Sequence, residues 1–150
     1  MSGGGTVVIA DDDADIRALI ALSVVRAGGV VAADVGTGSA ALDAIRRCAP
    51  DLAILDISMP EMTGLQVCRA IRADPTISEV LIMLLSASVQ PAAVAEGHAA
   101  GADVYEAKPF SPRRLAGRIR DMLQNRPANA GPGQSATRFV AMEESHGQLG

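Results

Sequence analysis

The chain has 150 residues, a net charge of −4 and 49% hydrophobic residues, which is typical of one globular domain. The acidic balance argues against a protein that binds nucleic acid through the phosphate backbone. The longest apolar run, residues 80–85, falls far short of the roughly 20 residues needed to span a bilayer. The first residues lack the features of a signal peptide. Cys48 and Cys68 have no metal-binding spacing and are expected to be reduced core residues, so the expected compartment is the cytoplasm.

Short apolar runs alternate with segments of helical periodicity along most of the chain. In chain order the sequence predicts a strand at 6–10, a helix at 14–27, a strand at 30–34, a helix from Thr37 or Ser39 to before Pro50, a strand at 51–56, a helix at 65–73, a strand at 80–86, a helix at 91–100, a strand at 103–107 and a helix from Ser111 to near Arg126. In the first helix, one buried face is expected to contain Ile16, Leu19, Ile20, Val24 and Ala27.

This alternation predicts an α/β fold, because β and α elements in turn form a parallel sheet with helices on both faces. Five strands suit the flavodoxin-like, doubly wound (βα)5 arrangement with the strand order 2-1-3-4-5. The unbroken apolar run at 52–55 is typical of a strand that is buried on both faces. The third strand is therefore expected near the middle of the sheet.

Composition divides the chain into three parts. Residues 1–5 contain three glycines and are expected to form a flexible leader. Residues 6–126 contain the five strand–helix units and form the predicted domain. Residues 127–150 begin with a stretch rich in Pro, Gly, Ala and Ser, and are expected to be a disordered tail or a linker, with the start of a second domain as the alternative.

Chemically active side chains stand at the carboxyl ends of four predicted strands. In chain order these are Asp11 and Asp12, Asp56, Ser86 and Lys108. The carboxyl ends of parallel strands open onto one crevice, where ligands bind. Three carboxylates suit a half-open Mg²⁺ site that a phosphoryl oxygen completes, and a carboxylate such as Asp56 can form an acyl phosphate. The sequence therefore predicts a site for Mg²⁺ and a phosphoryl group, with the lysine and the hydroxyl binding the remaining phosphoryl oxygens.

Four segments together resemble the receiver domains of two-component response regulators, the CheY-like family. They are VVIADDDADIR (7–17), DLAILDISMPEMTGLQVCRAIR (51–72), LLSAS (84–88) and GADVYEAKPF (101–110). The resemblance covers about residues 6–126, and the combination of motifs in this order is highly specific. It implies a signalling switch that is controlled by phosphorylation.

The resemblance implies a role for each site residue. Asp56 is the phosphoacceptor, and the Mg²⁺ ligands are Asp11, Asp12, Asp56 and the backbone carbonyl of Ser58. The residues that bind or respond to the phosphoryl group are Ser86, Ala87, Lys108 and Tyr105, the last being the aromatic that turns inward after phosphorylation. The peptide bond between Lys108 and Pro109 is expected to be cis, since X–Pro is the bond at which the cis form costs little.

The resemblance also implies partners. The phosphoryl group would come from a sensor histidine kinase or a histidine phosphotransferase, and the chain would catalyse only its own phosphorylation and dephosphorylation. A downstream protein partner is expected at the face formed by residues 91–126, a phosphorylation-induced homodimer is left open, and no direct contact with nucleic acid or membrane is expected. Residues 127–150 show no effector pattern, which favours a stand-alone receiver over the N-terminal receiver of a longer DNA-binding or enzymatic regulator.

Two other classes of protein use similar elements. An Mg²⁺-dependent phosphohydrolase with an aspartyl nucleophile, of the haloacid dehalogenase type, has a second acid two residues after the nucleophile, where this chain has Ser58. A flavin-binding domain of the same fold needs aromatic residues around the flavin ring, and this chain has only Tyr105, Phe110 and Phe139. Both classes are therefore weaker readings than the receiver.

Overall fold

The computed structural model describes residues 4–125, which form five strands and five helices in alternation. The elements in chain order are β1 (Thr6–Ala10), α1 (Ala14–Arg26), β2 (Val30–Val35), α2 (Gly38–Cys48), β3 (Leu52–Asp56), α3 (Gly64–Ala73), β4 (Leu81–Ser86), α4 (Pro91–Ala99), β5 (Val104–Ala107) and α5 (Pro112–Gln124). Every predicted element in this range is present, with ends shifted by no more than a residue or two. The predicted tail at 127–150, residue 126 and the first three residues of the predicted leader lie outside the described residues.

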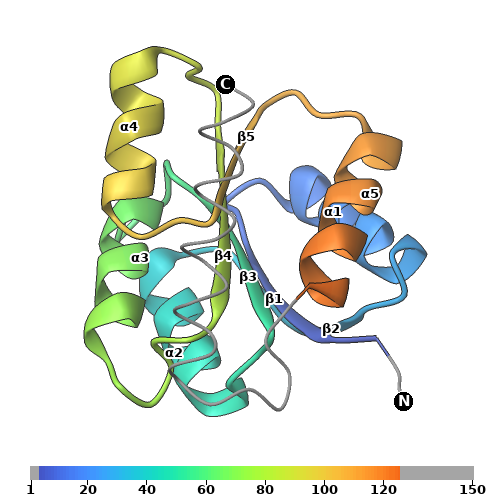
Figure 1. Cartoon of the computed structure of the whole chain (residues 1–150), viewed down its shortest axis with the longest axis horizontal. Coiled ribbons are helices and arrows are strands. Elements are labelled where there is room, and N and C mark those ends of the chain that lie inside the picture. Colours follow the sequence, from blue (N-terminus) through green and yellow to red (C-terminus); the bar gives the residue numbers. More distant parts are fainter. Residues whose placement is uncertain (1–3, 126–150) are drawn as a thin grey trace.

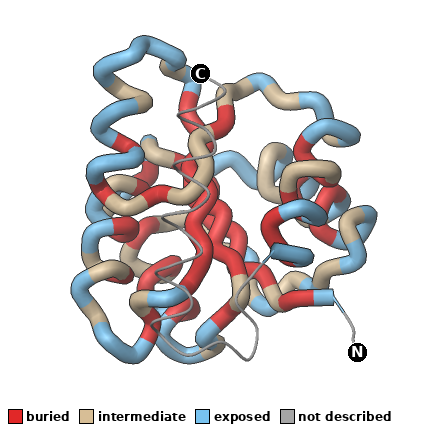
Figure 2. The backbone as a smooth tube through the Cα atoms, in the orientation of Figure 1, coloured by how far each residue is buried: buried red, intermediate tan, exposed pale blue. Residues whose placement is uncertain are grey.

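The five strands form one parallel sheet in the order β2-β1-β3-β4-β5, which confirms the predicted fold class. Helices α2, α3 and α4 cover one face of the sheet, and α1 and α5 cover the other (Figure 1). Strands β3 and β4 are buried along their whole length and form the red centre of Figure 2. Each large aliphatic side chain buried there contributes about 1.5–3 kcal/mol relative to an exposed one, so the middle of the sheet is a rigid base for the loops at its carboxyl edge.

Side-chain caps begin four of the helices. The Asp13 carboxylate caps α1, the Thr37 hydroxyl caps α2 and the Ser111 hydroxyl caps α5. Thr63 and Gln66 form a reciprocal capping box at the start of α3. Because each cap satisfies backbone N–H groups that have no partner inside the helix, the first turn of each helix has a defined position after the preceding loop. Of the two residues proposed to begin the second helix, Thr37 is the cap.

The buried face of α1 differs from the predicted one at Leu19. This side chain is 41% exposed, whereas Ile20 and Ser23 are fully buried. The Ser23 hydroxyl is accommodated because it donates hydrogen bonds to the carbonyls of Leu19 and Pro112. The prediction was wrong because α1 carries apolar residues on nearly every side, with Leu22 and Val25 also exposed. In such a helix the apolar spacing alone does not identify the face that packs.

The two cysteines differ in their surroundings. Both are free thiols, as predicted. Cys68 is buried, its thiol donates to the carbonyl of Ala100 at 3.3 Å, and burial raises its pKa to about 11. Cys48 is only partly buried, because it lies in the last turn of α2. The prediction of a core position therefore holds for Cys68 and not for Cys48.

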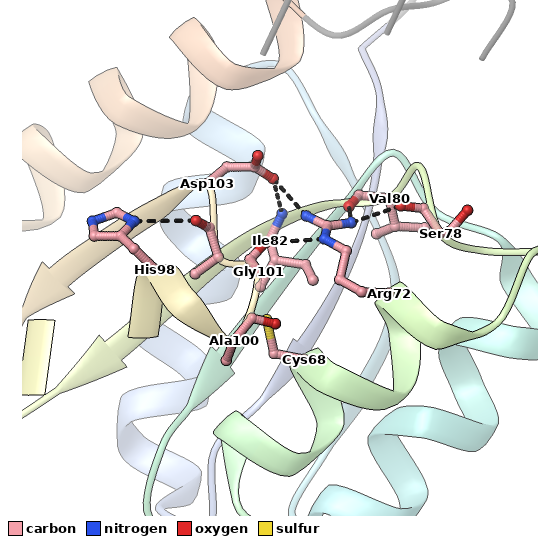
Figure 3. Close-up of polar contacts among 10 residues, drawn as sticks. Cys68, Arg72, Ser78, Val80, Ile82, His98, Ala100, Gly101 and Asp103 are labelled. Atoms are coloured by element: carbon pink, nitrogen blue, oxygen red, sulfur yellow. Dashed lines mark hydrogen bonds and ion pairs between the residues drawn. The ribbon is translucent and has the colours of Figure 1, made fainter. Parts of the chain in front are cut away.

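Arg72 joins α3 to the segment before β4 and to the segment between α4 and β5 (Figure 3). Its guanidinium donates to three backbone carbonyls, those of Ser78, Val80 and Gly101. It also forms an ion pair of 2.9 Å with Asp103, whose carboxylate accepts the backbone N–H of Ile82. One planar cation thus satisfies acceptors from several segments, which a lysine could not do with the same geometry. The sequence did not single out this residue.

We expect Arg72→Met to lower the free energy of unfolding by about 2 kcal/mol, because it leaves carbonyls and the Asp103 carboxylate with fewer donors. Arg72→Lys, which keeps the charge but loses the planar group, should recover only part of the loss. Urea unfolding followed by circular dichroism measures both. A midpoint for Arg72→Met equal to that of the wild type would show that water replaces these hydrogen bonds at no cost.

Candidate functional site

The predicted acidic residues meet at the carboxyl edge of the sheet. Asp11 and Asp12 follow β1 and Asp56 ends β3, and these two strands are paired in the sheet. One carboxylate oxygen from each of the three residues lies within 4.8 Å of the others. Asp11 and Asp56 are buried, whereas Asp12 is exposed. The cluster is therefore closed on the side of the protein and open on the side of Asp12.

Lys108 supplies the positive charge of this site. Its Nζ lies 2.9 Å from Oδ2 of Asp11 and 3.2 Å from Oδ1 of Asp56. Burial alone would lower the pKa of Lys108. The two carboxylates accept hydrogen bonds from the ammonium and attract its charge, and together these effects outweigh burial and raise the pKa. The lysine therefore remains protonated at neutral pH. The peptide bond that follows it, Lys108–Pro109, is cis, which confirms the prediction.

Asp56 is the carboxylate with the most perturbed surroundings. Burial first, and then the negative charge of Asp11, raise its pKa above the usual range, while Lys108 and the N–H of Ser58 partly offset this rise. The Ser58 N–H donates to Oδ1 of Asp56 at 3.3 Å, which places the backbone of Ser58 beside the cluster. A buried carboxylate with a raised pKa at an open edge is typical of a functional group.

The residues present fit a divalent cation with hard oxygen ligands. Oδ2 of Asp11 is buried, and the group that neutralises it within residues 4–125 is the Lys108 ammonium at 2.9 Å. Its other oxygen accepts the N–H of Asp13 at 2.9 Å, which orients the carboxylate. Three carboxylates thus surround one ammonium, and a divalent cation would relieve the repulsion between their negative charges. The carboxylate oxygens suit Mg²⁺, which binds one or two carboxylates and keeps several waters.

Ser86 ends β4 next to the cluster. In the register of β3 and β4, Asp56 lies opposite Leu85, the residue before Ser86. The Ser86 side chain is buried, and its Oγ accepts the N–H of Ser88 at 3.0 Å. Ala87, the other residue predicted to respond to the phosphoryl group, is exposed in the loop between β4 and α4.

Tyr105 connects β5 to this loop. Its side chain is half-buried, and its hydroxyl donates to the carbonyl of Ser88 at 2.8 Å. The N–H of Ser88 donates to Oγ of Ser86. Ser88 is therefore hydrogen-bonded to both predicted switch residues, Tyr105 and Ser86. The three residues therefore form a continuous set of hydrogen bonds from β5 to the end of β4.

Two glycines near these residues, Gly64 and Gly97, were not predicted from the sequence to shape the site. A β-carbon at Gly64 would lie 2.4 Å from the carbonyl oxygen of Asp56, so only glycine allows α3 to begin so close to β3. The N–H of Gly64 donates to the carbonyl of Ile57 at 2.9 Å, which closes the loop after Asp56. Gly97 lies in α4 against the ring of Tyr105. The position of Gly64 directly after the capping residue Thr63 indicates a glycine at a tight helix start. No local sequence pattern indicates a role for Gly97.

The architecture and the site match known proteins. The family model described as the response regulator receiver domain matches residues 7–120. The DNA-binding response regulator MtrA of Mycobacterium tuberculosis (strain ATCC 25618 / H37Rv) is 40% identical over 118 residues, which are 79% of this chain and 50% of MtrA. The transcriptional regulatory protein GltR of Pseudomonas aeruginosa is 37% identical over 123 residues, 82% of this chain and 50% of GltR. The chain thus spans about half the length of these relatives.

Solved structures give the same answer. The receiver domain of the putative response regulator NarL from Mycobacterium tuberculosis has a TM-score of 0.77 and 28% identity, covering 83% of this chain and all of that domain. The chemotaxis response regulator CheY4 of Vibrio cholerae has a TM-score of 0.74 and 29% identity, covering 80% of this chain and 99% of CheY4. Within residues 4–125, moreover, every helix is too short or too polar to cross a bilayer. The chain therefore belongs to the response regulator receiver domains, the signal-receiving modules of two-component systems.

Proposed function

We propose that the chain is switched by transfer of a phosphoryl group to Asp56. The observation that carries the proposal is the contact of the Lys108 ammonium with both Asp11 and Asp56 at the open edge of the sheet. This contact places a fixed positive charge beside a buried carboxylate, next to two further carboxylates that can hold a metal ion. Positioning and neutralisation of charge are what phosphoryl transfer mainly requires.

The residues have distinct roles in this proposal. A carboxylate oxygen of Asp56 forms a bond to phosphorus while the bond from phosphorus to the donor's imidazole nitrogen breaks. The ring nitrogen keeps the electron pair and takes a proton from solvent, which leaves an acyl phosphate and a neutral histidine. Lys108 pairs with one phosphoryl oxygen, and the Ser86 hydroxyl and the Ala87 N–H bind another. Asp11, Asp12, Asp56 and the Ser58 carbonyl hold Mg²⁺, which when bound neutralises phosphoryl oxygens. The chain acts only on itself: attack of water on phosphorus releases phosphate and restores the carboxylate.

The phosphoryl donor in this proposal is a sensor histidine kinase or a histidine phosphotransferase in the cytoplasm. The output surface is the predicted face at 91–126, whose described part is α4, β5 and α5; the two helices flank β5 at the edge of the sheet (Figure 1). The carboxylate of buried Glu106 in β5 forms ion pairs with two arginines of α5, from Oε2 to Nε of Arg114 at 3.6 Å and from Oε1 to Nη2 of Arg118 at 3.5 Å. These ion pairs link α5 to the strand. This face binds a downstream protein or a second phosphorylated copy of the chain.

Nucleic acid and membranes are not direct partners of this chain in the proposal. The net charge of −4 opposes binding to a phosphate backbone. MtrA is described as DNA-binding, but the part of it that matches here is half of its length. We propose residues 6–126 as the receiver unit, 1–5 as a flexible leader and 127–150 as a tail or linker, whether the receiver acts alone or as the first part of a longer regulator.

The test is chemical trapping of the acyl phosphate. The chain is incubated with a small phosphodonor such as acetyl phosphate and Mg²⁺, and borohydride then reduces any acyl phosphate to an alcohol that is located by peptide mass spectrometry. We expect reduction at Asp56, lost with a chelator. Asp43→Asn, which changes an exposed aspartate of α2, serves as the matched control and should be labelled like the wild type. Reduction at another residue, or none, contradicts the proposal.

A further inference from the structure

Gly97 lies where the ring of Tyr105 packs against α4. It is the one buried residue of this helix. A β-carbon at Gly97 would lie 2.7 Å from Cδ2 and 3.0 Å from Cε2 of Tyr105, and 3.3 Å from Cδ1 of Leu84. Real β-carbons essentially never approach another heavy atom within 3.0 Å, so the ring would have to shift to admit any other side chain at this position.

The backbone does not require glycine at this position. Among the described residues, the glycines with positive φ are Gly28 and Gly101, so Gly97 has a conformation open to any residue. Glycine in the middle of a helix is also less favourable than alanine. Glycine at position 97 is therefore favoured by close side-chain neighbours, and the Tyr105 ring is the nearest of them, with Leu84 at a looser 3.3 Å.

Gly117 in α5 provides the contrast. It too lies inside a helix, but a β-carbon there would have no atom within 4 Å. Alanine at this position gains helix propensity and meets no obstacle. The same substitution therefore meets the Tyr105 ring, and more loosely Leu84, at buried Gly97, and meets no atom at half-buried Gly117.

The position of the ring determines what its hydroxyl can reach. Tyr105 Oη donates to the carbonyl of Ser88 at 2.8 Å, and the N–H of Ser88 donates to Oγ of Ser86 at 3.0 Å. A ring displaced from α4 carries its hydroxyl away from Ser88. The loop between β4 and α4 then loses the contact that ties it to β5.

We propose that Gly97 is a positioning residue for the switch: by lacking a β-carbon it admits the Tyr105 ring against α4, and so allows the tyrosine hydroxyl to hold the loop that contacts Ser86. Gly97 acts through Tyr105 and contacts no phosphoryl group itself. The link to signalling rests on the proposed function of Asp56 and Ser86. The placement of the ring by Gly97 does not depend on that function and is tested separately.

The chain contains a single tyrosine and no tryptophan, so its intrinsic fluorescence reports on Tyr105 alone. We expect Gly97→Ala to increase quenching of this emission by acrylamide, because the ring leaves its packed position. Gly117→Ala should be quenched like the wild type. The clash is with side-chain atoms and not with backbone, so Gly97→Ala should remain folded, as circular dichroism can verify.

The inference is overturned if Gly97→Ala shows wild-type quenching together with the increase in melting temperature expected for Gly117→Ala. If Gly97→Ala alone does not fold, it is combined with Tyr105→Leu, which removes the ring. Folding of the double variant then supports the clash with Tyr105, and failure of the double variant to fold contradicts it.

A second measurement separates this inference from the proposed function. Beryllofluoride with Mg²⁺ mimics the phosphoryl group, and its binding to the chain is followed by calorimetry. We expect wild type and Gly97→Ala both to bind it, and only the wild type and Gly117→Ala to show a change in tyrosine emission on binding. An unchanged response in Gly97→Ala contradicts the coupling. No binding to any form contradicts the proposed function of Asp56, while acrylamide quenching still decides the role of Gly97.

Discussion

Asp56→Asn is expected to abolish phosphorylation and at the same time to stabilise the chain at neutral pH. Asparagine has no carboxylate to form an acyl phosphate, so trapping at this position should fall to the background. The folded state meanwhile no longer contains a buried charge beside Asp11. Burial and the Asp11 charge raise the pKa of Asp56, which means that the charged form is less favourable in the folded state than in the unfolded state.

The same reasoning gives a pH dependence of known sign. Because the pKa of Asp56 is higher in the folded state, the folded chain binds the proton more tightly, and the wild type gains stability from this group as the pH falls through the folded pKa. The gain is complete below the unfolded pKa and is lost as the pH rises. Asp56→Asn lacks this contribution, so its advantage over the wild type should shrink from neutral to acidic pH.

Urea unfolding at several pH values, without divalent cations, measures this difference. Asp43→Asn is the control, since it removes an exposed carboxylate with the same change of charge. It should show no comparable advantage at neutral pH. If Asp56→Asn proves less stable than the wild type at neutral pH, then attraction to Lys108 outweighs burial, and the charged carboxylate stabilises the fold.

Lys108→Met should have the largest effect on stability. It removes the cation that contacts both Asp11 and Asp56, at 2.9 and 3.2 Å. Loss of one partner from a buried ion pair leaves an uncompensated charge and costs about 3 kcal/mol. We expect a loss of this size in a chelator. Mg²⁺ should reverse part of it, since a cation that binds only the folded state stabilises that state by mass action.

Two further variants make this prediction specific. Lys108→Arg keeps the positive charge and should lose less stability than Lys108→Met. The double variant Lys108→Met/Asp56→Asn should lose less free energy of unfolding than the sum of the two single changes, because one of the two carboxylates left without Lys108 is also removed. Additive effects in this double-mutant cycle, measured by urea unfolding, would show that Lys108 and Asp56 do not interact in solution.

The order of the elements and the edge of the sheet at which the acidic residues and Lys108 meet follow from local patterns in the sequence. Residues 52–55, for example, are apolar without a break, which in an alternating α/β pattern indicates a buried parallel strand. Once the strands are parallel, residues at their carboxyl ends must meet at one edge, so the proximity of Asp11, Asp56 and Lys108 can be predicted from the sequence. Ser111 before Pro112 marked the start of the last helix, because both residues act on the backbone next to them.

Which helix faces pack, and which distant residues meet, depends on tertiary packing. Leu19 was predicted to be buried but is exposed, because α1 is apolar on nearly every side and packing against α5 then selects the face. Arg72 and Asp103, which form an ion pair, are 31 residues apart. The close contact at Gly97 in α4 is with the ring of Tyr105 in β5. Local propensity and periodicity act over a few neighbouring residues, whereas these contacts depend on how closely separate elements approach, and that distance exists only once the sheet and its helices have packed.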